Sequence, residues 1–88
     1  MTSLNHNKII QFNCRSVYSN LSELKRLIYR NKPIVVALCE TWINNSNARY
    51  PRFAEYNTEW VNRIDRLGGG LGLLISKDIQ YRLVDLSL

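Results

Sequence analysis

Two polar residues, Asn13 and Glu40, stand at the C-terminal ends of two short apolar runs in this chain of 88 residues. The runs, residues 8–13 and 34–39, have the composition of β-strands. A carboxylate beside an amide suits a hard cation such as Mg²⁺, which takes few protein ligands and keeps waters and substrate phosphates around it. The same two side chains would also serve simply to cap the strand ends and to hydrogen-bond the loop that starts at Thr41.

A helix between the two runs determines whether Asn13 and Glu40 can meet. Apolar residues recur at helical spacing, as Leu21, Leu24, Leu27 and Ile28. Asn20 is a good N-cap, and Glu23 three residues later completes a capping box. The sequence at residues 31–33 is a stop signal, so we expect a helix over residues 21–31.

A strand, a helix and a second strand form a βαβ unit, whose strands are parallel and adjacent with a right-handed connection. The carboxyl ends of both strands then lie at one edge of the sheet, where open α/β sheets bind their ligands. Residues 34–39 show no polar alternation, which is typical of a strand covered on both faces. Asn13 and Glu40 are therefore expected side by side.

The remainder of the chain predicts an irregular connection and then more strands. Residues 41–56 are polar, with Trp42, Tyr50 and Phe53 as anchors, and a connection of this length is usually functional or mobile. Strands are expected near residues 58–62, 71–76 and 79–83, forming an antiparallel meander. The fold class is α/β, in a single domain.

The glycine cluster at residues 68–72 does not fit a phosphate-binding loop. Residue 73 is leucine where G-x-G-x-x-G needs glycine, and a β-like run follows where that motif opens a helix. We expect instead a tight turn and a strand start that is crowded against another backbone.

Composition limits the class of protein. Twelve basic residues against seven acidic ones give 12 − 7 = +5, a weak indication of an anionic partner. Two cysteines, Cys14 and Cys39, are too few for a disulfide framework. No signal peptide and no apolar run of membrane-spanning length is visible, so an intracellular protein without membrane contact is expected.

Four segments together resemble the start of the endonuclease/exonuclease/phosphatase superfamily, closest to the apurinic-type endonuclease domain of non-LTR (LINE-like) retrotransposons. They stand in the right order and spacing: residues 9–16 with Asn-Cys-Arg-Ser, the helix start at 20–24, residues 33–42 ending in Glu-Thr-Trp, and Arg63 to Gly72. The resemblance implies a DNase I-like fold, a two-sheet α/β sandwich of which residues 1–88 would be the N-terminal portion.

The resemblance also implies roles for individual residues. Glu40 would be the Mg²⁺-binding carboxylate, with Mn²⁺ as a substitute, and Asn13 the active-site amide. Arg15, Arg63 and Arg66 would contact DNA phosphates, or else be ordinary surface arginines, while Trp42 would pack beneath the site. The implied activity is DNA nicking that primes a downstream reverse transcriptase, in the nucleus.

The chain also departs from that family, whose complete domain is more than twice as long. The later active-site Tyr, Asp-x-Asn and Ser-Asp-His motifs are missing, and the one histidine, His6, precedes the first strand. Whether this chain is itself an enzyme is therefore undecided by sequence, and we expect it to be inactive alone. The absent second layer should leave an apolar sheet face and an unpaired strand edge exposed, which favours association.

Two alternatives remain from sequence. Another branch of the same superfamily, such as a phosphatase, a lipid phosphodiesterase or a deadenylase, would share Asn13 and Glu40. A non-catalytic basic nucleic-acid-binding module would use the charge of +5 and would stack bases on Tyr18, Tyr50 and Trp60.

Overall fold

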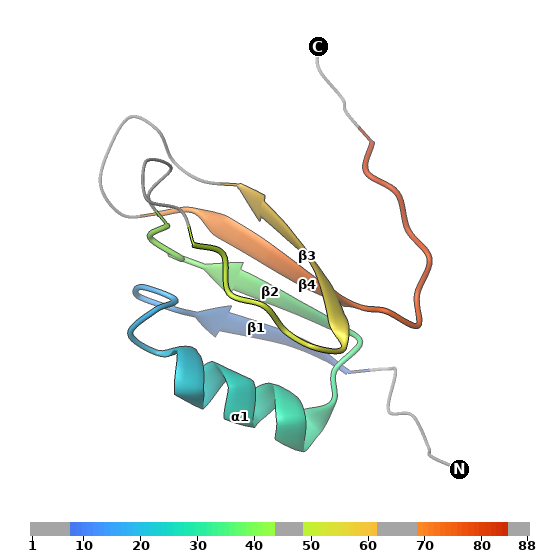
Figure 1. The fold of residues 1–88 in the computed structure, drawn as a ribbon, viewed down its shortest axis with the longest axis horizontal. Coiled ribbons are helices and arrows are strands. Elements are labelled where there is room, and N and C mark those ends of the chain that lie inside the picture. Colours follow the sequence, from blue (N-terminus) through green and yellow to red (C-terminus); the bar gives the residue numbers. More distant parts are fainter. Residues whose placement is uncertain (1–7, 44–48, 62–68, 85–88) are drawn as a thin grey trace.

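A computed structural model describes residues 8–43, 49–61 and 69–84. Four strands and one helix form, in the order β1 (Ile9–Asn13), α1 (Leu21–Asn31), β2 (Val35–Cys39), β3 (Tyr56–Val61) and β4 (Leu71–Ser76). They make one mixed sheet with α1 packed along it (Figure 1). The predicted βαβ unit is confirmed, since β1 and β2 pair in parallel and Asn13 stands opposite Cys39.

Helix α1 has the predicted bounds, but its N-terminus is built differently from the prediction. Asn20 makes no side-chain cap hydrogen bond, so the capping box is not formed. Its Nδ2 instead donates to the carbonyl oxygen of Cys14 at 2.6 Å, which joins the helix start to the end of β1. At the other end Lys32 adopts a left-handed conformation, and its N–H donates to the Ile28 carbonyl. This contact ends the helix where the stop signal was predicted.

The strand order is β1-β2-β4-β3, with β4 antiparallel to both of its neighbours. The predicted three-stranded meander is wrong in its last strand, because residues 79–83 form no strand. A turn after β4, closed by the Ile79 N–H donating to Ser76, leads the chain away from the sheet. Because β2 and β3 occupy both edges of β4, a following strand has no place beside it.

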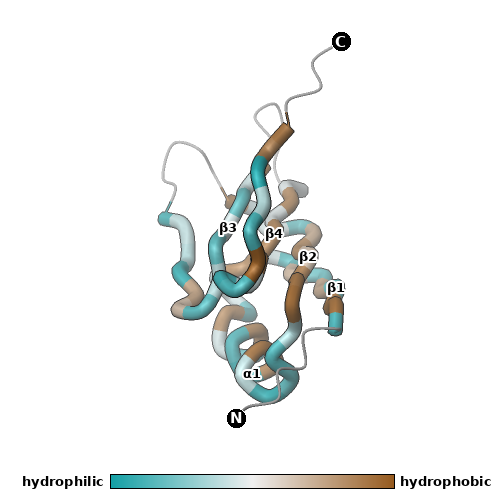
Figure 2. The backbone as a smooth tube through the Cα atoms, turned by 90° about the vertical axis from the view of Figure 1, so that its right-hand side faces the viewer, coloured by the Kyte–Doolittle hydropathy of each residue, from teal (hydrophilic) through white to brown (hydrophobic). Residues whose placement is uncertain are grey.

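One face of the sheet carries the core. Val36, Leu38 and Leu74 are at most 1% exposed, and Leu24 and Ile28 of α1 pack in the same cluster. Phe53 closes this core from the connection before β3, as predicted for an anchor. Hydrophobic residues run along the central strands β2 and β4 (Figure 2).

The opposite face is open. The register aligns Ile9, Val35, Ile75 and their neighbours on this side, and large apolar side chains there are exposed: Ile9 by 72%, Val61 by 66%, Leu71 by 56% and Leu73 by 41%. β2 is therefore fully buried on one face only, and the prediction of a strand covered on both faces is wrong. The expectation of an exposed apolar face is confirmed.

Candidate functional site

Asn13 and Glu40 meet at the carboxyl ends of β1 and β2, as predicted. The Asn13 Nδ2 donates to Glu40 Oε2 at 3.1 Å. Asn13 is exposed and Glu40 is half-buried, so the pair is accessible from solvent. The parallel register produces this contact, because Asn13 lies opposite Cys39 and Glu40 is the next residue.

The backbone around this pair is strained. Four residues at this sheet edge have left-handed φ values although they carry side chains: Arg15 at 44°, Ser16 at 84°, Glu40 at 52° and Trp42 at 57°. Each such residue costs about 1–3 kcal/mol and persists only where its surroundings hold it. Strain of this kind gathers at ligand-binding sites more often than elsewhere, which makes this edge a functional candidate on geometry alone.

Backbone hydrogen bonds hold the strained loops on the β1 side. The N–H groups of Cys14, Ser16 and Val17 donate to the carbonyls of Cys39, Glu40 and Thr41 at 2.9, 3.0 and 2.9 Å. The parallel pairing of β1 with β2 thus continues beyond the strands into the site. The Glu40 backbone is fixed by the segment that also carries Asn13.

The glycines hold the other side of the same loop. Trp42 N–H donates to the Gly69 carbonyl at 2.8 Å, and Thr41 N–H points to the Gly70 carbonyl at 3.4 Å. Gly69 and Gly70 have φ values of 75° and 90°, which glycine adopts without the usual penalty. The predicted turn and crowded strand start are confirmed for these two glycines, while Gly68 lies outside the described residues.

The other residues singled out by sequence have mixed outcomes. Arg15 is exposed and lies two residues beyond Asn13, at the same edge. Arg63, Arg66 and His6 fall outside the described residues. Trp42 is 46% exposed, so the expectation that it packs beneath the site is wrong.

Cys14 does not add a reactive group to this edge. Cys14 and Cys39 are both free thiols, and Cys14 is fully buried. Burial raises the pKa of Cys14 to about 11, with further contributions from nearby Cys39 and from the charge of Glu40. A thiol with so high a pKa is neutral at physiological pH and is a poor metal ligand or nucleophile.

The donor set fits Mg²⁺ better than a transition metal. Within residues 8–43, 49–61 and 69–84 no group of three or more His, Cys, Asp or Glu side chains comes together. Zinc sites need such a group. Mg²⁺ instead takes one or two carboxylates and completes its octahedron with water and phosphate oxygens. Glu40 can supply the carboxylate, and Asn13 holds one of its oxygens in place.

Sequence reasoning missed the roles that three residues play at this edge: Asn20, Thr41 and Gly70. Asn20 carried a signal, but for a different role, because an amide at a helix start usually caps the helix. Thr41 is fully buried and its Oγ1 has no hydrogen-bond partner among the described residues. Nothing in the residue type of Thr41 indicated that position. The Gly70 contact could be predicted only as crowding of an unspecified kind.

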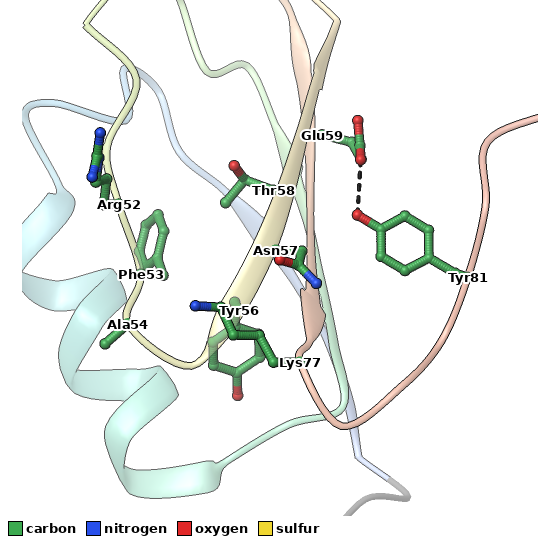
Figure 3. A pocket seen from close by; sticks show the side chains of 9 residues that line it. All are labelled: Arg52, Phe53, Ala54, Tyr56, Asn57, Thr58, Glu59, Lys77 and Tyr81. Carbon is green, nitrogen blue, oxygen red and sulfur yellow. Dashed lines mark hydrogen bonds between the residues drawn. The ribbon is translucent and has the colours of Figure 1, made fainter.

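A separate hollow of about 530 Å³ lies along β3. Its lining contains none of the residues predicted for the site (Figure 3). On the α1 side it includes Phe53 and Thr58, and on the open side Tyr81 donates to Glu59 Oε2 at 2.8 Å. This hollow is an open depression with lining residues on both faces of the edge strand β3. The candidate site is therefore the sheet edge with Asn13 and Glu40.

Sequence comparison finds no matching protein family and no matching curated protein. Comparison with solved structures gives an AP endonuclease from Archaeoglobus fulgidus, with a TM-score of 0.63 and 21% identity. It also gives a 3'-5' exonuclease from Neisseria meningitidis, with a TM-score of 0.62 and 18% identity. The chain has a DNase I-like fold.

The similarity covers 75% of this chain and 26% of either neighbour. The chain thus spans about a quarter of the length of the structures it matches, as a piece of that two-sheet fold. At this level of identity the likeness shows the fold alone. No helix in the described part of the chain is long and apolar enough to cross a membrane.

Proposed function

We propose that Asn13 and Glu40 are the metal-binding part of a Mg²⁺-dependent phosphodiesterase that acts on DNA. The observation that carries the proposal is the Asn13–Glu40 hydrogen bond of 3.1 Å at the ends of two parallel strands. The same edge has strained backbone and lies in a DNase I-like fold. Ligands of open α/β sheets bind at such an edge.

Each residue has a chemical task in this proposal. Glu40 would hold the metal, and Asn13 fixes the carboxylate by donating to Oε2. Bound Mg²⁺ supplies polarisation of a phosphoryl oxygen and stabilisation of the leaving oxygen. Arg15, exposed two residues beyond Asn13, would contact a DNA phosphate.

We further propose that these 88 residues do not hydrolyse DNA by themselves. Activation of water needs a general base. The part of the chain that the structure describes contains no histidine, since the one histidine of the sequence is His6. The assignment to the retrotransposon endonuclease type depends on the sequence segments with Asn-Cys-Arg-Ser, Glu-Thr-Trp and residues 63–70. An in-frame continuation with Asp-x-Asn and Ser-Asp-His motifs and a reverse transcriptase would support this assignment.

Metal binding tests the first part of the proposal. Titration of the ¹⁵N-labelled chain with Mn²⁺ should broaden the side-chain amide signal of Asn13 before others. Glu40→Gln should abolish that broadening, because it removes the charge of the carboxylate that accepts the Asn13 hydrogen bond. Glu23→Gln is the matched control, since Glu23 is an exposed carboxylate on α1. Equal broadening in wild type and Glu40→Gln would contradict the assignment.

Plasmid nicking tests the second part. With Mg²⁺ and supercoiled plasmid, the chain should give no nicking above that of Glu40→Ala. Nicking by the wild type that Glu40→Ala abolishes would disprove inactivity. DNA binding that weakens with salt, but is unchanged by Mg²⁺ and by Glu40→Ala, would favour a non-catalytic basic nucleic-acid-binding module instead.

A further inference from the structure

Gly70 lies against the residue that follows Glu40. A Cβ added at Gly70 would lie 2.5 Å from Thr41 Oγ1, a separation that real Cβ atoms do not tolerate. It would also be 3.7 Å from the Trp42 backbone nitrogen. With a φ of 90°, Gly70 adopts a backbone conformation that residues with side chains rarely enter. Glycine is therefore required here for two independent reasons.

The contact between Gly70 and Thr41 acts on the segment 40–42, whose backbone is held by hydrogen bonds on both sides. On one side the carbonyls of Glu40 and Thr41 accept from Ser16 and Val17. On the other side the N–H groups of Thr41 and Trp42 face the carbonyls of Gly70 and Gly69. Glu40 lies between these two sets of hydrogen bonds and has a left-handed backbone conformation. A displacement of Thr41 must therefore change the Glu40 backbone angles, which set the direction of the Glu40 side chain.

We propose that Gly70 is a positioning residue for Glu40, acting through its contact with Thr41. The proposal rests on the metal-binding part of the function proposed above. The absence of a side chain at Gly70 lets Thr41 enter its fully buried position. That position keeps the Glu40 carboxylate within reach of the Asn13 amide at 3.1 Å.

The test is Gly70→Ala, with Gly72→Ala as the matched control. A Cβ at Gly72 would also be too close to a neighbour, at 2.6 Å from the Trp60 ring, but the three atoms nearest to it belong to Trp60 and Leu38 and not to the loop 40–42. In the absence of metal, Gly70→Ala should move the Asn13 side-chain amide resonances toward their values in Glu40→Gln, whereas Gly72→Ala should leave them in place. Mn²⁺ affinity should fall about tenfold or more in Gly70→Ala, the usual loss when a metal ligand's supporting contact is removed.

A compensating substitution separates positioning from general damage. In Gly70→Ala combined with Thr41→Ala, the added methyl group takes the space of the removed hydroxyl, so the Asn13 resonances and the Mn²⁺ affinity should return part of the way, while the strain from the φ of 90° remains. Independent effects would add instead. If Gly70→Ala does not fold, Thr41→Val carries the test, because a methyl group in place of the smaller Oγ1, which has no hydrogen-bond partner among the described residues, presses on Gly70 in the same contact and should shift the Asn13 amide.

The outcomes distinguish the two proposals. Asn13 amide resonances that are unchanged in Gly70→Ala, or in Thr41→Val, overturn the positioning role whatever the metal does. Absence of Mn²⁺ broadening at Asn13 in the wild type overturns the metal site but leaves the metal-free shift as a valid test of positioning.

Discussion

Both faces of the four-stranded sheet carry apolar side chains, but α1 and Phe53 cover only one of them. On the covered face Leu74 is fully buried, whereas its neighbour Leu73 on the open face is 41% exposed. Asn13 shares the open side with Ile9 and Gln11, because alternate residues of β1 point the same way. The buried core that stabilises the fold therefore lies on one side of the sheet, and the Asn13 side chain of the candidate site lies on the other.

Substitution of adjacent leucines should give the largest difference. Leu74→Ala should reduce the free energy of unfolding by about 2–5 kcal/mol, because it leaves a cavity in the core. Leu73→Ala removes the same atoms from the open face and should cost roughly 1 kcal/mol. Urea unfolding followed by far-UV circular dichroism measures both. Equal losses would show that the open face is covered in solution.

Self-association should depend on the open face. The wild-type chain should sediment faster as its concentration rises, since exposed Leu71 and its neighbours can bury one another. Leu71→Lys should weaken this association about tenfold or more, because a charge replaces a side chain that would be buried. The control Tyr29→Lys adds the same charge on the outer side of α1, where Tyr29 is 78% exposed. A monodisperse wild-type monomer that melts cooperatively would contradict the prediction.

The thiols of Cys39 and Cys14 should react at different rates, because Cys39 lies on the open face and Cys14 is buried. Cys39 is half-buried on the open side, while Cys14 is fully buried with a pKa raised to about 11. At pH 8 the raised pKa keeps the Cys14 thiol almost entirely neutral. Brief labelling with iodoacetamide should therefore modify Cys39 first, as read by peptide mass spectrometry, and Cys14 labelling should speed up as pH approaches 11. Preferential labelling of Cys14 at pH 8 would contradict the assigned burial.

The smallest effect should come from the segment after β4 that reaches the open face. The hydrogen bond to Glu59 raises the pKa of Tyr81 above its ordinary value of 10.0. A raised pKa means that the bond stabilises the fold below pH 10 and that its contribution is lost as pH rises through the folded-state pKa. Tyr81→Phe should thus lower the urea midpoint slightly at pH 7 and not at all above the Tyr81 pKa. Tyr29→Phe, at an exposed site on α1, should have no effect at either pH.

Local patterns were sufficient to predict most of the fold. The bounds of α1 follow from the spacing of its leucines, and β4 was predicted residue for residue. The meeting of Asn13 and Glu40 also follows from sequence, because parallel strands joined by a helix must end at one edge. Each of these features depends only on residues that are close in sequence or on one strand-helix-strand crossover.

Features that depend on tertiary competition were not predictable. The alternation at residues 79–83 has a strand pattern, but β4 has no free edge for it. Asn20 has the residue type of a cap, but the Cys14 carbonyl competes for its amide. The fit of Gly70 against Thr41 joins residues far apart in the chain, and no local pattern encodes it.

The order of the elements along the chain, β1, α1, β2, β3 and β4, also sets the order in which the site can be completed. During synthesis β1, α1 and β2 leave the ribosome first, so Asn13 and Glu40 can come together while β4 does not yet exist. Gly69 and Gly70 arrive only with β4, which must insert beside β2 after a long intervening segment has closed. The nascent chain therefore contains both polar side chains before it contains the carbonyls that hold Thr41 and Trp42.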